Sequence, residues 1–228
     1  MKSNYLIDKH IEKLYRYGYT DFLLPNEFLQ VKNKLKKTEY NVYKPYIDSE
    51  KVILYRKIKP EIVLYKIICS EPLRHQDILG TLFSLNLSIY VYGDIIIDGN
   101  NYYLFVLPTL TNYLESNLTK IKNIPITLEK ENLSIIENYK REYKEHEIIV
   151  TSLRIDTVIS GITGLSRTMV ISKIKNKEVY LNYEILTNNS YVLKENDIFS
   201  IRKYGKYKYN KILKNTKKGK LLINCFKY

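Results

Sequence analysis

Residues 152–167, with the sequence SLRIDTVISGITGLSR, decide how the last third of the chain folds. Their apolar spacing predicts two short helices, and Ser166 has the residue type and position of an N-cap for the second one. The apolar residues expected to face inward are Leu153, Val158, Ile162, Val170, Ile171 and Ile174. Strands are expected to follow at residues 179–181 and 198–202, so the segment predicts a helix pair beside a small sheet.

Two arginines stand at the starts of these helices. Arg167 lies in the first turn of the second helix, where free backbone N–H groups and the helix dipole favour a phosphate. Arg154 begins the first helix, and both guanidinium groups can make forked hydrogen bonds to phosphate or to a base edge. Two other interpretations stay open: Arg154 forms an ion pair with Asp156 or a neighbouring acid, and Arg167 is a solvated helix start. Lys173 and Lys177 are further candidates for RNA contact.

The positive charge of the chain is concentrated in the same region. Residues 151–228 contain 16 Lys and Arg against 5 Asp and Glu, a balance of +11 out of +13 for the whole chain. Such a surface attracts polyphosphates and makes binding salt-dependent. The densest stretch is 202–220, which also carries tyrosines, although a chain with 23 tyrosines gives little weight to any single one. The candidate RNA-binding residues here, besides Ser166, are Arg202, Lys203, Tyr204, Lys206, Lys217, Lys218 and Lys220. The alternative is that this stretch only confers solubility and loose affinity for nucleic acid.

The rest of the chain predicts an α+β protein with three regions. Residues 1–49 form an N-terminal helical region, with a helix over 3–17 and a second helix beginning at Pro25. Residues 50–147 follow the order β-α-β-β-α-β, which is typical of a ferredoxin-like (RRM-like) domain. Residues 148–228 form the basic third region with a terminal hairpin. The charged stretch 129–147 is interpreted as a linker or a solvated helix.

The third region resembles the S4-type RNA-binding domain, which is named for a small-subunit ribosomal protein. The motifs that carry this resemblance, over about residues 150–205, are the Arg-Ile-Asp of 154–156, the Ser-Arg of 166–167 and the strand that ends at Asn182. Lys177 stands where the family usually has Gly, which adds a charge in that turn. The resemblance implies a fold of the αL type and binding to structured RNA.

A narrower resemblance spans roughly residues 18–228. The segments 19–25, 73–82, 93–95, 202–207 and 215–220 resemble the YlmH family of bacterial S4-domain proteins. This resemblance implies a cytoplasmic protein without a catalytic centre. It also implies partners in ribosomal RNA and tRNA on the large ribosomal subunit, in translation quality control and rescue of stalled ribosomes. The family often has a Lys-Arg pair where this chain has Ser88 and Ile89, so any RNA contact by that pair is lost here.

Other classes of function have less support. His75 and Asp77 are the candidate pair of His with an acid, and no nucleophile or second ligand cluster accompanies them, so we expect no enzyme. Neither a cofactor nor a metal site is expected, because Cys69 and Cys225 both lie in apolar runs typical of strands. A non-catalytic adaptor linked to cell division, or an RNA-modification enzyme that uses the basic region for targeting, remain alternatives.

The composition also sets expectations about location and assembly. No run of 18 apolar residues occurs, so no transmembrane helix and no membrane partner are expected. The first nine residues, MKSNYLIDK, contain charges and no apolar stretch of the kind that a secretory signal needs. We therefore expect a cytoplasmic monomer.

Overall fold

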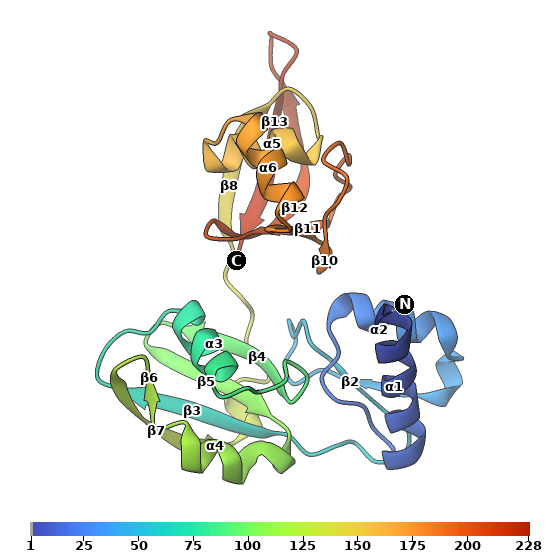
Figure 1. Ribbon diagram of the computed structural model, residues 1–228, viewed down its shortest axis with the longest axis vertical. Helices are drawn as coiled ribbons and strands as arrows, with labels where there is room; N and C mark the ends of the chain where they lie inside the picture. Colours follow the sequence, from blue (N-terminus) through green and yellow to red (C-terminus); the bar gives the residue numbers. More distant parts are fainter. Residues whose placement is uncertain (1) are drawn as a thin grey trace. The chain divides into compact units, whose positions relative to one another are not determined.

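The computed structural model describes residues 2–228, whose course is shown in Figure 1. The chain divides into two compact units, of which the first ends at Lys140 and the second spans Arg141–Tyr228. Both units combine helices with antiparallel sheets, as expected for the α+β class. Among the described residues, no helix has the length and apolar character needed to cross a bilayer.

The first unit begins with two helices and a small hairpin. These elements are α1 (Lys2–Tyr17), α2 (Pro25–Lys34), the 3-10 turn η1 (Lys37–Glu39), and the paired strands β1 (Asn41–Tyr43) and β2 (Ile53–Tyr55). Pro25 takes the first position of α2, as predicted, because its missing N–H is not needed there. The Glu27 carboxylate accepts a hydrogen bond from the Leu24 N–H at 2.9 Å and satisfies one of the free donors at this helix start.

His10 lies on the buried side of α1. Its side chain is 2% exposed, and neither ring nitrogen has a hydrogen-bond partner among the described residues. The ring packs edge-on against Tyr90, with 5.2 Å between the ring centroids. Burial lowers the pKa of His10 to about 4, so this residue is uncharged in the folded protein at neutral pH.

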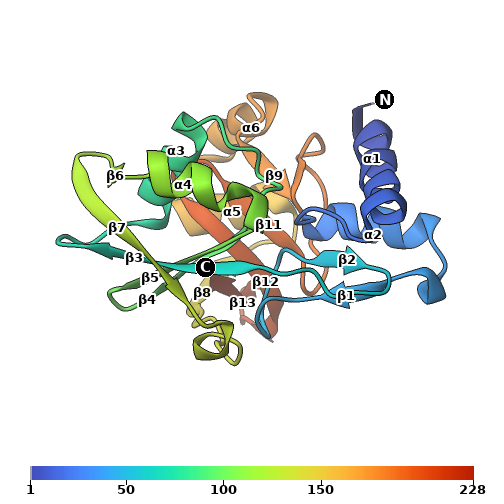
Figure 2. The same ribbon diagram turned by 90° about the horizontal axis from the view of Figure 1, so that it is seen from below.

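The middle of the first unit is a five-stranded antiparallel sheet. Its elements are β3 (Val63–Cys69), α3 (His75–Ser84), β4 (Tyr92–Asp98), β5 (Asn101–Val106), the turn η2 (Pro108–Leu110), α4 (Thr111–Asn117), β6 (Lys120–Ile121) and β7 (Ile124–Glu131). The strand order is β4-β5-β3-β7-β6, and α3 and α4 lie on one face (Figure 2). The predicted order β-α-β-β-α-β is formed by β3, α3, β4, β5, α4 and β7, whereas the short strand β6 was not predicted. Gly99 has φ 58° in the tight turn between β4 and β5, where Gly adopts this conformation readily.

The opposite face of this sheet is covered within the same unit. Phe22 and Tyr46, from the N-terminal segments, pack there against Phe105 of β5, and Tyr46 stacks on Phe105 with 5.6 Å between centroids. Gly93 of β4 is required for this packing, since a Cβ at that position would lie 2.9 Å from atoms of both Phe22 and Phe105. Strand β5 is therefore buried on both faces, whereas β3 leaves Ile68 exposed near its end.

Asp94 fixes the N-terminal segments to β4. Its buried carboxylate accepts hydrogen bonds from the Tyr46 hydroxyl at 2.8 Å and from the Glu50 N–H at 2.7 Å. The neighbouring Lys51 is also buried and donates to the carbonyls of Ile89 and Tyr92 at 2.6 and 2.7 Å. The Gly-Asp pair at residues 93–94 thus has a structural role, because buried polar groups need partners.

The second unit is a six-stranded antiparallel sheet covered on one face by two helices. Its elements are β8 (Lys144–Val150), α5 (Ile155–Thr163), α6 (Arg167–Lys175), β9 (Val179–Leu181), β10 (Glu184–Ile185), β11 (Ile198–Ile201), β12 (Gly205–Asn215) and β13 (Leu221–Lys227). The strand order is β10-β9-β11-β12-β13-β8. Val158 and Val170 from the helices pack against Phe199, Tyr207 and Ile223 from the sheet. The predicted helix pair beside a sheet is confirmed.

The charged stretch 129–147 includes the end of one strand and the start of another, which corrects its interpretation as a linker or helix. Strand β7 continues to Glu131, the 3-10 turn η3 (Leu133–Ile135) follows, and β8 begins at Lys144. Within β8, Ile148 and Val150 face the core while Glu145 and Glu147 are exposed. This alternation suits an edge strand, whose charged residues discourage pairing with other chains. The boundary expected at 147/148 falls inside β8.

Candidate nucleic-acid interface

One buried carboxylate holds two arginines at the start of the helix pair. Asp156, in the first turn of α5, is fully buried, whereas the side chains of Arg154 and Arg167 are 38% and 55% exposed. Nη2 of Arg154 and Nη2 of Arg167 donate to the same oxygen of Asp156, Oδ2, at 2.8 and 2.9 Å, and Arg154 Nε donates to Oδ1 at 3.2 Å. The guanidinium groups therefore lie side by side.

The electrostatics of this trio leave a net positive charge at the surface. Burial by itself would raise the pKa of Asp156, but the hydrogen bonds from Arg154 and Arg167 outweigh it and hold that pKa well below its usual range. The aspartate stays ionised at neutral pH and compensates only one of the two arginines. Each guanidinium has five N–H donors, of which Asp156 uses a part, so donors remain for a phosphate.

The start of α6 adds backbone donors next to this pair. Ser166 is the N-cap of α6, and its hydroxyl oxygen accepts a hydrogen bond from the Met169 N–H at 3.3 Å, which confirms the predicted cap. Arg167 is the first residue of the helix. The remaining N–H groups of the first turn carry the positive end of the helix dipole. The arrangement can bind an anion with backbone and guanidinium donors together.

A second basic group lies at the turn between β11 and β12. Lys173, near the end of α6, forms an ion pair with Glu178 at 2.8 Å and stands 5.7 Å from the ring centroid of Tyr204. The Arg202 N–H donates to the carbonyl of Glu178 at 2.9 Å, which brings the turn beside this pair. Arg202 and Lys203 are exposed. Lys173 is thus partly neutralised by its partner, and the exposed charge of this group comes from the turn.

Lys177 keeps the backbone conformation that a glycine favours. Its φ is 59°, in the left-handed region, and its side chain is exposed. The family resemblance places Gly at this position, and the left-handed turn explains that preference, because Gly adopts positive φ without a steric cost. Lys177 thus adds an exposed positive charge at a left-handed turn.

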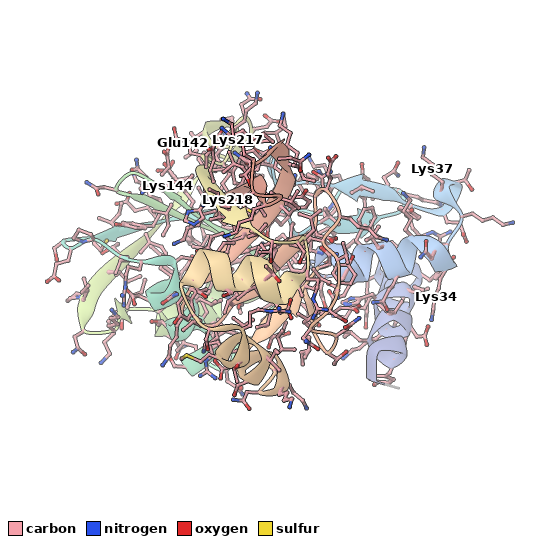
Figure 3. All side chains as sticks on the ribbon, turned by 90° about the horizontal axis from the view of Figure 1, so that it is seen from above. Lys34, Lys37, Glu142, Lys144, Lys217 and Lys218 are labelled. Carbon is pink, nitrogen blue, oxygen red and sulfur yellow. The ribbon has the colours of Figure 1, made fainter. Side chains whose placement is uncertain are left out.

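The remaining basic candidates lie elsewhere on the unit. Lys217, Lys218 and Lys220 occupy the exposed turn between β12 and β13, which extends beyond α5 and α6 in Figure 1; Figure 3 labels two of these side chains. The Thr216 N–H donates to the carbonyl of Lys220 at 2.7 Å and closes the turn. Lys206 lies on the sheet face opposite the helices, since the adjacent Tyr207 faces them.

The basic stretch 202–220 is therefore not one patch. Strand β12 has 11 residues and separates Arg202 and Lys203 at its start from Lys217, Lys218 and Lys220 beyond its end. At a rise of about 3.3 Å per residue, the two groups are up to roughly 35 Å apart. The structure brings Arg154 and Arg167 together, and it places Lys173 beside the turn that contains Tyr204. It separates the basic residues at the start of β12 from those beyond its end.

The first unit has a comparable cluster of different character. Asp77 is the third residue of α3, and its carboxylate binds the Arg74 guanidinium at 3.0 and 3.1 Å and the Lys122 ammonium at 2.8 Å. The hydrogen bonds from Arg74, and then from Lys122, hold the pKa of Asp77 well below its usual range. His75 and Asp77 were the enzyme candidate of the sequence. The carboxylate instead caps the helix start and is too weak a base for proton abstraction.

The charge of residues 61–135 contrasts with that of the second unit. This segment holds five Lys and Arg against eight Asp and Glu, a balance of −3. Tyr103 and Phe105, on the sheet face where RRM-type domains stack bases, are buried under Phe22 and Tyr46. Base stacking on Tyr103 and Phe105 is therefore blocked in this unit.

Asp156 and Glu178 are the site residues whose roles the sequence did not establish. Asp156 was only one possible partner of Arg154, and nothing in the sequence joined it to Arg167, 11 positions away. The available signal was the Asp two residues after Arg154, because a buried acid at a helix start needs a cationic partner.

Comparison with known proteins gives three similarities. Residues 61–135 match the family described as "Putative RNA-binding domain in YlmH". The chain is 30% identical over 146 residues to ribosome-associated protein quality control protein P2 of Bacillus subtilis strain 168. The aligned region covers 64% of this chain and 57% of that protein. The solved structure of cell division protein YlmH from Streptococcus pneumoniae matches with a TM-score of 0.49 and 19% identity, covering 59% of this chain and 92% of that chain. The chain thus spans less than two thirds of the curated relative, and its resemblance to the YlmH family is confirmed.

Proposed function

We propose that the protein binds structured RNA through its second unit and that its physiological target is the ribosome. The observation that carries this proposal is the pair formed by Arg154 and Arg167 on buried Asp156, beside the free N–H groups of α6. The common carboxylate pre-organises both guanidinium groups, so less side-chain entropy is lost when a phosphate binds. Lysines on flexible stems would lack this geometry.

The fold assignments belong to the same proposal. The second unit is an S4-type domain of the αL kind, extended by the hairpin of β12 and β13. The middle of the first unit is a ferredoxin-like, RRM-like domain, which is supported by its strand order with β3 and β5 at the centre. Its net negative charge and covered sheet indicate that it adds little phosphate binding. The second unit supplies most of the RNA affinity.

The proposed RNA is ribosomal RNA with tRNA on the large subunit, in quality control and rescue of stalled ribosomes. The name of the Bacillus subtilis relative supports a ribosomal role. The separation of Arg202 and Lys203 from the hairpin turn supports a large, compact RNA, because two linked contacts raise affinity only where the target offers phosphates at both places. Compact RNA helices also present phosphates rather than readable base edges.

The test compares two double variants that remove the same number of charges. R154Q/R167Q removes the pair in the second unit, and R74Q/K122Q removes the two cations on Asp77 in the first. We expect R154Q/R167Q to weaken binding of a structured ribosomal RNA fragment about 10- to 100-fold, as expected for charge-assisted hydrogen bonds of ~1.5–3 kcal/mol. The control should retain wild-type affinity. Equal loss in both proteins would show that only total charge matters and would overturn the site.

No catalytic step is part of this proposal. Asp77 is ionised, bound by two cations and unsuited as a general base. Turnover of RNA or a nucleotide that disappears in a folded Asp77→Asn or His75→Ala protein would contradict it.

A further inference from the structure

The sheet face opposite α5 and α6 carries a second group of basic and aromatic residues. Both helices of the second unit, whose residues 141–228 are all described, pack on the face that includes Tyr207 and Tyr209. Side chains alternate along β12, so Lys206 and Lys208 point to the other face. Lys208 stands opposite Phe226 of β13, which is half-buried. That face of the sheet is not covered by a helix of its own unit.

Strand register places these residues in a row across the sheet. Tyr180 of β9 is opposite Ser200 of β11, and Ser200 is opposite Lys206 of β12. The Tyr228 N–H donates to the carbonyl of Lys206 at 3.0 Å, and the Tyr143 ring is edge-on to the Tyr228 ring at 5.1 Å. Tyr180 and Tyr143, at the two ends of the row, are 41% and 38% exposed. We call this row, with Tyr183 beside it, the tyrosine row.

Cations are seated on the rings of the tyrosine row. The Lys206 ammonium lies 4.6 Å from the ring centroid of Tyr183 and 4.4 Å from that of Tyr228. The Arg141 guanidinium lies 5.3 Å from the Tyr228 ring centroid. Glu145 of β8 is opposite Phe226 and accepts a hydrogen bond from Asn224 at 3.2 Å. Positive charge is therefore held directly beside aromatic surface.

We propose that the tyrosine row binds an unpaired stretch of RNA. Its bases stack on Tyr143 and Tyr180, and its phosphates lie against Lys206, Lys208 and Arg141. Stacking on aromatic side chains combined with a positive groove is how proteins bind single strands without sequence preference. The inference rests on the proposed function, since it adds a second RNA surface on the face opposite the arginine pair.

The chemistry of the row favours RNA over a protein partner. Lysine is depleted in the centre of protein interfaces, whereas here Lys206 occupies the centre of the row. The chain is rich in tyrosine, but composition alone does not align Tyr180, Tyr228 and Tyr143 in one row with a lysine. The pairing register does so, and the exposed rings stand at its ends.

The experiment uses the full chain and two RNAs, a blunt-ended hairpin and the same hairpin with an unpaired extension containing 2-aminopurine. The variant Y143S/Y180S removes the exposed rings, and Y17S/Y113S removes two exposed tyrosines from the first unit as a control. We expect wild type to prefer the extended RNA and to quench the 2-aminopurine. The variant should lose about tenfold or more in affinity for the extended RNA only, since stacking is worth roughly 5- to 150-fold per base. The control should behave as wild type.

The outcomes separate this inference from the proposed function. If wild type binds the blunt hairpin and the extended hairpin equally, or if Y143S/Y180S binds the extension as wild type does, the tyrosine row is not an RNA surface. If wild type binds neither RNA, the proposed function fails as well. Should Y143S/Y180S unfold, K206Q tests the same point: it should weaken only the extended complex and lower its salt slope by roughly 0.7. If wild type forms a dimer that only the variants of the tyrosine row dissociate, this sheet face binds a second copy of the chain. That result would overturn the proposal.

Discussion

At the scale of single residues, we expect Asp156 to strengthen RNA binding although it is negatively charged. D156N makes the protein more positive by one, so a surface that acts by total charge would bind RNA more tightly. We expect weaker binding, by roughly three- to tenfold, because Arg154 and Arg167 lose the carboxylate that orients them. The unfolding free energy should fall by about 1–3 kcal/mol as well. Fluorescence anisotropy with a structured RNA and chemical denaturation measure both quantities. An increase in affinity would show that the pairing has no orienting role.

His10 makes a second prediction at this scale. Its pKa is lowered by burial to about 4, below the ordinary value of 6.5, so the unfolded chain binds a proton more readily than the folded one between these values. Stability should therefore be unaffected above pH 6.5 and should fall as the pH drops through 6.5 toward 4. The contribution reaches about 3 kcal/mol near pH 4, because each pKa unit corresponds to about 1.4 kcal/mol. H10L should remove this part of the acid dependence in denaturation curves from pH 7 to pH 4. An unchanged slope would assign the dependence to other groups.

At the scale of elements, the turn between β12 and β13 should contribute to RNA binding without stabilising the fold. The side chains of Lys217, Lys218 and Lys220 are exposed, and no ion pair between them and the rest of the described chain is seen. Replacing all three by Ala should leave thermal unfolding within about 1 °C, since exposed substitutions have small effects. The same change should reduce co-sedimentation with large ribosomal subunits at moderate salt. If the triple variant sediments like wild type, the turn is ordinary charged surface.

The elements also show what sequence alone could establish. The Ser166 cap and the elements with clear apolar periodicity were predictable, because capping chemistry and apolar periodicity are local, whereas the charged strand β8 was not predicted. The distribution of charge was not predictable. Along the sequence, Arg202 and Lys218 belong to one basic run, but an extended strand places them far apart, and alternation sends Lys206 to the opposite face. The pairing of Lys173 with Glu178 likewise depends on how α6 meets β9, which is a tertiary contact.

At the scale of the whole molecule, the position of β8 decides where the chain can be divided. A protein ending at Lys140 keeps the first unit intact, so we expect it to fold cooperatively and to lose nearly all affinity for structured RNA. A protein ending at Val150 retains β8 without its partner β13 and exposes Ile148 and Val150. It should aggregate, because an unpaired apolar strand is a template for association. Size-exclusion chromatography and RNA titration test both. Full RNA affinity in the shorter protein would move the binding site to the first unit.

The length of β12 has a consequence for selectivity. Strand β12 holds the basic turns at its two ends a fixed distance apart, so the turns select an RNA whose phosphates have a matching spacing. A narrower RNA can contact only one of the two turns. Such binding depends on the length of an RNA stem and not on its base sequence. Base-pair exchanges that preserve a stem should be tolerated, whereas shortening the stem should remove its contact with one of the two turns. Deleting two residues from β12 and the two residues that pair with them in β13 would bring the two basic turns about 7 Å closer together. The preferred stem should then become shorter, while the order of preference among base sequences stays the same.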